Sequence, residues 1–269
     1  MRCLVLIFTW DKSPPYKELH ALHRKLGFYK HKNFDHFWVR CDTDINENVE
    51  LHNDVVKVKM PKKKDNAHDE AHFYLEKRLY SIEFMYKNFG YKYDYFICMN
   101  ETVFPVINTL NKICESFDCN ESVFCGLGGE YDPIWGEPTS ECPYKPGQKM
   151  PFVSMDCFIM STSTVSILVN GIDSMINHRI DTKCEDIVVC HYLLHNKNLN
   201  LNIKVKHMNR TDIENFQRNV DWAINDIRIN GHDRGYMRIK TLFVNENRLC
   251  EIDIHTHLYH MCKDLKLIN

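Results

Sequence analysis

The stretch Tyr93-Asp94-Tyr95-Phe96-Ile97-Cys98-Met99-Asn100-Glu101-Thr102-Val103-Phe104 decides how we interpret this chain. Its first half is an aromatic and β-branched run, which is typical of a buried strand in a parallel sheet. The run stops at Asn100, Glu101 and Thr102. Because ligands of open α/β sheets bind beyond the carboxyl ends of the strands, these three residues are candidates for a binding site. The alternative is that they form only a turn before the helix that follows Pro105.

The residues before this stretch alternate between strand and helix patterns. Apolar strands are predicted at 3–9, 37–41 and 55–58, and spacings of three and four residues predict helices over 16–26 and 67–89. This order predicts an α/β fold with a mostly parallel, Rossmann-like central sheet flanked by helices. No Gly-x-Gly-x-x-Gly follows the first strand and no P-loop occurs, which argues against a dehydrogenase-type dinucleotide fold.

The second half of the chain is patterned less regularly. We predict helices over 106–117 and 248–265, strands at 122–126, 152–160 and 199–205, and a helix after the N-cap Ser161 that includes Val165, Leu168, Ile172 and Met175. The segment 131–151 carries five prolines and two glycines, so we expect a long loop that folds over a substrate. The segment 210–234 has no pattern that places it.

Composition limits the classes of function. The formal net charge of −2 over 269 residues gives no electrostatic reason to expect a nucleic-acid partner. Several of the twelve cysteines lie in apolar runs and no Cys-x-x-Cys pair occurs, so we expect core thiols in a reducing compartment and no structural zinc. The apolar start is too short for a membrane anchor, so we predict a cytoplasmic protein without a transmembrane segment.

One acidic pair stands where catalysis could occur. Glu185 and Asp186 open a predicted helix directly after a loop. Acidic residues stabilise helix N-termini and need no other role there. The functional alternative is that one carboxylate serves as a general base. Three histidines of the last helix, His255, His257 and His260, are expected to face solvent.

Five short motifs occur in one order along the chain. They are Asn100-Glu101-Thr102, Ser154 to Ser161, Glu185-Asp186-Ile187, Tyr236-Met237-Arg238-Ile239-Lys240, and Arg248 with Asp253-Ile254. In this order the chain resembles the GT-A glycosyltransferases, and more closely a group of small nucleotide-sugar glycosyltransferases of large DNA viruses and bacteria. The resemblance implies a single GT-A-like domain over 1–269, with a nucleotide-binding half at 1–102 and an acceptor-binding half with the C-terminal helix at 103–269.

The chain departs from that family in three places. The metal-binding Asp-x-Asp is absent, and Cys98 stands where relatives tend to have Arg. The glycines expected near Met155 and Cys157 are replaced, with Asp156 between them, which puts the acceptor side in doubt.

The resemblance implies transfer of a hexosyl or pentosyl group from a nucleoside diphosphate sugar to a hydroxyl of a glycan or glycoprotein, in the host cytoplasm if the protein is viral. Asp186 would be the general base of an inverting reaction, with Glu185 as second choice. The strand-end loops predict donor contacts at Thr9, Trp10, Asp11, Asp42, Asp44 and Asn100, and the resemblance adds Lys77.

The departing diphosphate needs a cation. Either Mn²⁺ or Mg²⁺ binds with Glu101 as its ligand, or Arg238, Lys240 and Arg248 form a clamp. We expect Glu101 and Asp186 to face one cavity. The alternatives are an inactive nucleotide-sugar-binding protein of the same fold and a nucleotidyltransferase.

Overall fold

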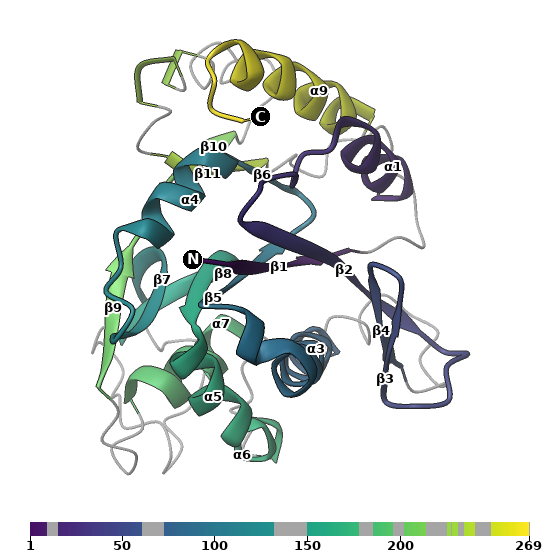
Figure 1. Cartoon of the computed structure of the whole chain (residues 1–269), viewed down its shortest axis with the longest axis vertical. Helices are drawn as coiled ribbons and strands as arrows, with labels where there is room; N and C mark the ends of the chain where they lie inside the picture. Colours follow the sequence, from purple (N-terminus) through teal and green to yellow (C-terminus); the bar gives the residue numbers. More distant parts are fainter. Residues whose placement is uncertain are drawn as a thin grey trace.

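The apolar runs form strands and the segments with helical spacing form helices in the computed structural model (Figure 1), which describes residues 1–9, 16–60, 73–131, 150–177, 185–195, 202–213, 225–226, 228–230, 234–239 and 249–268. The strands are β1 (Cys3–Phe8), β2 (Phe34–Asp42), β3 (Val49–His52), β4 (Val55–Lys59), β5 (Tyr95–Asn100), β6 (Val103–Pro105), β7 (Ser122–Tyr131), β8 (Met150–Ser161), β9 (Ile203–His207), β10 (Asn209–Ile213) and β11 (Arg234–Ile239). The α-helices are α1 (Tyr16–Leu26), α3 (Tyr74–Phe89), α4 (Ile107–Glu115), α5 (Thr162–Asn170), α6 (Ile172–Asn177), α7 (Glu185–Cys190) and α9 (Leu249–Asp264). A 3₁₀ turn (Gly90–Lys92) and a π-helical turn (His191–His195) complete the described elements.

The main sheet is mixed and has the order β3-β4-β2-β1-β5-β8-β7-β9. Strands β1, β2, β4 and β5 of this sheet lie parallel to one another, as the alternation of strands and helices predicts. Strand β8 then enters antiparallel between β5 and β7, with Met99 opposite Cys157. The beginning of β8 therefore lies beyond the carboxyl end of β5.

Alternation along the strands divides the core in two. In β1, Cys3, Val5 and Ile7 face α4, α9 and the chain after α1, while Leu4, Leu6 and Phe8 face the opposite side. Helices α3, α5, α6 and α7 cover that opposite side (Figure 1). Each face of the sheet thus carries its own set of helices, and a strand residue reaches one set or the other according to its place in the alternation.

A second, smaller sheet has the order β10-β11-β6. Strand β6 follows β5 almost directly and pairs antiparallel with β11, so that Met237 lies opposite Phe104. Tyr236 and Met237 pack in the core beneath α4 and α9. The segment 210–234, for which no sequence pattern predicted a structure, therefore contains most of β10 and the first residue of β11. Both strands belong to the small sheet that β6 joins directly after the end of β5.

Most predicted elements are confirmed, with different limits. The helix at 16–26 is found as α1, and Ser161 caps α5 by accepting a hydrogen bond from the amide of Thr164. The helix expected over 67–89 is described from Tyr74 onward, and the interior of the loop expected at 131–151 lies outside the described residues. The strand expected at 199–205 is described as β9, which begins at Ile203 and ends at His207. Strand β7 continues past Gly126 to Tyr131, because β8 pairs with this longer part.

Seven of the nine cysteines whose side chains are described are buried. Burial raises the pKa of Cys98 to about 12, so this thiol stays protonated and packs as a small apolar group. Within the described residues, no helix combines the length and the apolar character needed to span a membrane.

Candidate functional site

Polar side chains gather at the carboxyl ends of the three neighbouring strands β2, β1 and β5. The amide of Thr9 donates to Val39 O at 3.0 Å, and the amide of Glu101 donates to Phe8 O at 3.0 Å. These bonds continue the sheet pairing by one residue and bring Thr9 and Glu101 side by side. Ligands of open α/β sheets bind at this edge. The structure thus brings together the predicted residues Thr9, Asn100 and Glu101.

Glu101 lies on the α1 side of the sheet, because it follows Tyr95, Ile97 and Met99 in the alternation of β5. Its side chain is 1% exposed. Oε2 accepts a hydrogen bond from the hydroxyl of Thr9, and Oε1 lies 3.7 Å from Nδ1 of His20 on α1. The carboxylate is therefore enclosed by groups of the protein.

Asn100 points to the opposite side, where α3 supplies two buried cations. The guanidinium of Arg78 donates to Asn100 Oδ1 at 3.1 Å and to Met155 O at 2.8 Å, and it stacks 4.5 Å from the centre of the Phe8 ring. Lys77 Nζ donates to the carbonyl of Thr9 at 2.6 Å. Both side chains are at most 1% exposed. Lys77 is therefore not a surface lysine, and it fixes the end of β1 as the strand leaves the sheet.

Asp42 ends β2, the strand next to β1. Its carboxylate accepts a hydrogen bond from the amide of Asp44 at 3.1 Å and lies 3.2 Å from Lys57 Nζ. Partial burial by itself raises the pKa of Asp42, but the Asp44 amide and Lys57 outweigh it and hold the pKa below its ordinary value. Asp42 is therefore an ionised acceptor near neutral pH.

Strand β8 bulges where it passes the end of β5. Gly126 of β7 pairs with Phe158 and Gly128 with Val153, so that a single residue of β7 faces four of β8. Such bulges redirect side chains and are common beside active sites. Here the bulge turns Asp156 toward β10, where it accepts hydrogen bonds from Arg210 Nη1 at 3.1 Å and from Ser154 Oγ at 2.9 Å.

The hydroxyl of Tyr236 on β11 lies in the same buried group of side chains. Burial is the main cause that raises the pKa of Tyr236 well above its ordinary value, and the neighbouring Cys157 and Asp156 side chains add to it. The phenol therefore stays neutral beside the Asp156–Arg210 pair, and this group joins the small sheet to the bulge in β8.

Glu185 and Asp186 begin α7, as predicted. The other end of α7 reaches the bulge, where the amide of Val153 donates to Cys190 Sγ at 3.2 Å. The half-buried Asp186 thus belongs to the helices on the side of Asn100 and Arg78, whereas the carboxylate of Glu101 turns toward α1. The described contacts do not support the expectation that Glu101 and Asp186 face one cavity.

Several predicted site residues cannot be placed in this geometry. Trp10, Asp11, Lys240 and Arg248 lie outside the described residues, as do the side chains of Glu185 and Arg238. Their predicted roles stay predictions. The sequence analysis did not identify Arg78. This residue lies in the apolar stripe of α3 between Leu75 and Ile82, and a charged residue at such a position could have been predicted to be buried.

A divalent metal at Glu101 does not fit the described surroundings. Mg²⁺ and Mn²⁺ need several oxygen ligands and bound waters around an accessible carboxylate, whereas both oxygens of Glu101 face protein groups. Within the described ranges, no group of three or more His, Cys, Asp or Glu side chains is arranged to hold a metal ion.

No family model matches the sequence, and a search of curated proteins found no match. Solved structures with a similar fold include a glycosyltransferase involved in the glycosylation of the major capsid of PBCV-1, with 10% sequence identity and a TM-score of 0.48 over 96% of this chain and 100% of that one. The glycosyltransferase GlyE of Streptococcus pneumoniae TIGR4 has 8% identity and a TM-score of 0.43 over 99% of this chain and 64% of GlyE. Its apo form has 8% identity and a TM-score of 0.45 over 98% and 63%.

This chain therefore spans less than two thirds of the length of GlyE.

Proposed function

We propose that the chain is a glycosyltransferase that moves a sugar from a nucleoside diphosphate sugar to a hydroxyl of a glycan acceptor. The observation that carries the proposal is the group of polar residues after β2, β1 and β5, held in place by the buried cations Lys77 and Arg78. Nucleotides bind α/β sheets at this edge. The order of the motifs along the sequence supplies the reaction class.

The donor lies over the carboxyl ends of β1 and β2 in this proposal. Thr9, Trp10, Asp11 and Asp42 form the nucleotide side, where the ionised Asp42 accepts hydrogen bonds from sugar hydroxyls. The clamp for the diphosphate is made by Arg238, Lys240 and Arg248, because Arg binds phosphate oxygens two at a time. The poor fit of Glu101 to a metal favours this clamp over Mn²⁺ or Mg²⁺.

Sugar transfer also requires removal of the acceptor's proton. A hydroxyl has a pKa far above neutrality, so a positioned carboxylate takes the proton as the oxygen attacks the anomeric carbon. We assign this role to Asp186, with Glu185 as the alternative. A single base without a nucleophile gives inversion at the anomeric carbon. Cysteines that are buried as small apolar groups agree with a reducing compartment, so we place the reaction in the cytoplasm, that of the host if the protein is viral.

Two measurements test the proposal. In a thermal-shift screen of nucleotides and nucleotide sugars, the donor should raise the melting temperature of the protein. Running the screen with manganese and with chelator shows whether a metal contributes to donor binding. With that donor and simple glycosides, Asp186→Asn should lower kcat by about 10²- to 10⁴-fold, the range for loss of a general base.

Asp173→Asn, at an exposed carboxylate on α6, is the control and should leave kcat unchanged. Full activity of Asp186→Asn would contradict the assignment of the base. Calorimetric binding of a nucleotide sugar without transfer or hydrolysis would instead select an inactive binding protein. Release of diphosphate in place of nucleoside diphosphate would indicate a nucleotidyltransferase.

A further inference from the structure

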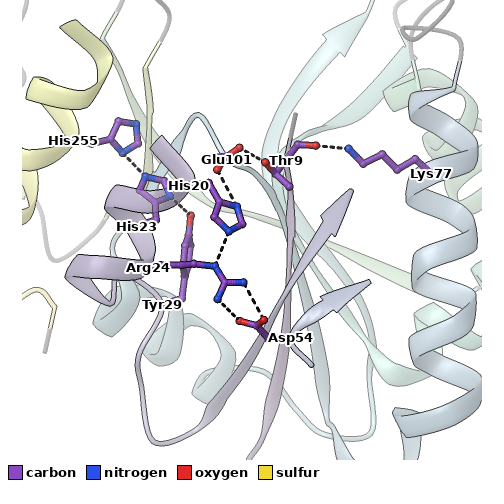
Figure 2. Close-up of polar contacts among 9 residues, drawn as sticks. All are labelled: Thr9, His20, His23, Arg24, Tyr29, Asp54, Lys77, Glu101 and His255. Atoms are coloured by element: carbon purple, nitrogen blue, oxygen red, sulfur yellow. Dashed lines mark hydrogen bonds and ion pairs between the residues drawn. The ribbon is translucent and has the colours of Figure 1, made fainter. Parts of the chain in front are cut away.

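Thr9 is held by three different parts of the molecule, and Figure 2 shows two of them, Lys77 and Glu101. Its amide donates to Val39 O at 3.0 Å, its carbonyl accepts from Lys77 Nζ at 2.6 Å, and its hydroxyl donates to Glu101. Lys77 comes from α3 on one face of the sheet, and the Glu101 carboxylate lies on the other face. Thr9, the residue that follows β1, is thus fixed by two buried side chains of opposite charge.

The second oxygen of Glu101 faces a chain of polar groups that runs to the surface. Arg24 Nε donates to His20 Nε2 at 2.6 Å, so a neutral His20 carries its proton on Nδ1, the nitrogen that faces Glu101 at 3.7 Å. Arg24 in turn pairs with both oxygens of Asp54 at 2.9 Å (Figure 2). The proton of His20 thus faces the buried carboxylate, and Arg24, paired with Asp54, holds the His20 ring in this orientation.

This arrangement gives Glu101 a task other than metal binding. A metal ligand directs an oxygen outward to an ion and its waters, whereas Glu101 is 1% exposed and engages Thr9 and His20. We propose that Glu101 is a positioning residue, which fixes the end of β1 through the hydroxyl of Thr9 and does not ligate a divalent metal. The inference rests on the proposed function only in treating Thr9 as a donor-side residue, and its tests need no sugar transfer.

The first test measures manganese binding. Titration of the full chain with Mn²⁺ alone, followed by the electron paramagnetic resonance signal of the free ion, should give the same affinity and stoichiometry for the native chain and Glu101→Gln. Loss of a manganese site in Glu101→Gln, or weakening by about tenfold, which is 1.4 kcal/mol, would overturn the proposal.

The second test measures positioning by hydrogen–deuterium exchange of the amides of Thr9 and Glu101. Because each substitution removes one partner of the same hydrogen bond, Glu101→Met, which has no oxygen to accept it, and Thr9→Val should each speed exchange by about tenfold, and the double variant should add little. Thr9→Ser keeps the hydroxyl and should exchange within about twofold of the native chain. Additive effects of the two single variants, or no rescue by Thr9→Ser, would overturn the positioning role.

Glu121→Gln is the matched control, since it removes a carboxylate that pairs with Lys204 and Lys206 near the start of β7. It should leave exchange at Thr9 unchanged. If Glu101→Gln or Glu101→Met does not fold, Glu101→Asp replaces it, because the shorter side chain keeps its charge but withdraws from Thr9. Fast exchange with unchanged manganese binding then supports the proposal, and slow exchange contradicts it. If the native chain bound no nucleotide, the proposed function would be wrong, but manganese titration and hydrogen–deuterium exchange would still test the role of Glu101.

Discussion

Replacing His255 by Gln should make the folded protein less sensitive to acid. His255 on α9 is fully buried, and its Nδ1 lies 3.0 Å from Nε2 of His23 on α1 (Figure 2). Nδ1 of His23 lies 3.0 Å from the hydroxyl of Tyr29. Burial lowers the pKa of His255 to about 3, and burial together with the neighbouring His255 and His20 lowers the pKa of His23 well below its ordinary value.

The sign and size of the effect follow from these values. As the pH falls through about 6.5, the unfolded chain binds a proton at His255, whereas the folded chain binds one only near pH 3. Stability that is present above pH 6.5 is therefore lost progressively between pH 6.5 and 3. At pH 5 the difference of 1.5 pH units corresponds to about 2 kcal/mol for His255 alone. His23 adds to this loss, and His20 is the other titratable group that lowers the pKa of His23.

Urea denaturation of the native chain, His255→Gln and His257→Gln at pH 7, 6 and 5 measures the prediction. Between pH 7 and 5, the free energy of unfolding of His255→Gln should fall by about 2 kcal/mol less than that of the native chain. His257 is exposed on the same helix, so His257→Gln should follow the native chain. Parallel pH dependences of the native chain and His255→Gln would refute the reasoning.

Two further substitutions test how the site is held. Arg78→Met should destabilise the protein by about 2 to 4 kcal/mol, because it leaves Met155 O and Asn100 Oδ1 without their donor, while Lys87→Met at an exposed position of α3 should change thermal unfolding little. Gly126→Ala places a methyl group 2.5 Å from Val153 Cγ1 and should cost about 1 to 3 kcal/mol in thermal denaturation, with partial recovery in the double variant with Val153→Ala. An unchanged Arg78→Met, or a double variant no better than Gly126→Ala, would contradict these contacts.

The sequence was most informative where local patterns and tertiary packing agree. The spacing of leucines predicts α1 at its observed limits, and the apolar runs predict β1 and β5 to within a residue. The missed strands β3, β6, β10 and β11 are short, and three of them pair with segments far away in the sequence. Their stability comes from partners that a local pattern does not contain.

The sequence predicted several residues of the candidate site but not how their side chains are arranged. Strand ends indicated Thr9, Asn100 and Glu101, but the direction of each side chain depends on alternation and on which helices cover each face. The expectation that His255 faces solvent was wrong, because His255 lies in the apolar stripe of α9 with Leu258 and Cys262. A polar residue inside an apolar stripe, as for Arg78 and His255, is the sequence signal that predicts a buried functional or structural role.

The packing of α9 against α1 also has a consequence during protein synthesis. Helix α9, which covers His23, begins at Leu249, more than 200 residues after α1 ends at Leu26, so that whole segment is synthesised before this face of β1 and β2 is sealed. Until then α1 and the aromatic ring of Phe28 lack the cover that His255 and Tyr259 provide. A nascent chain in this state exposes apolar surface, which is the kind of surface that chaperones bind.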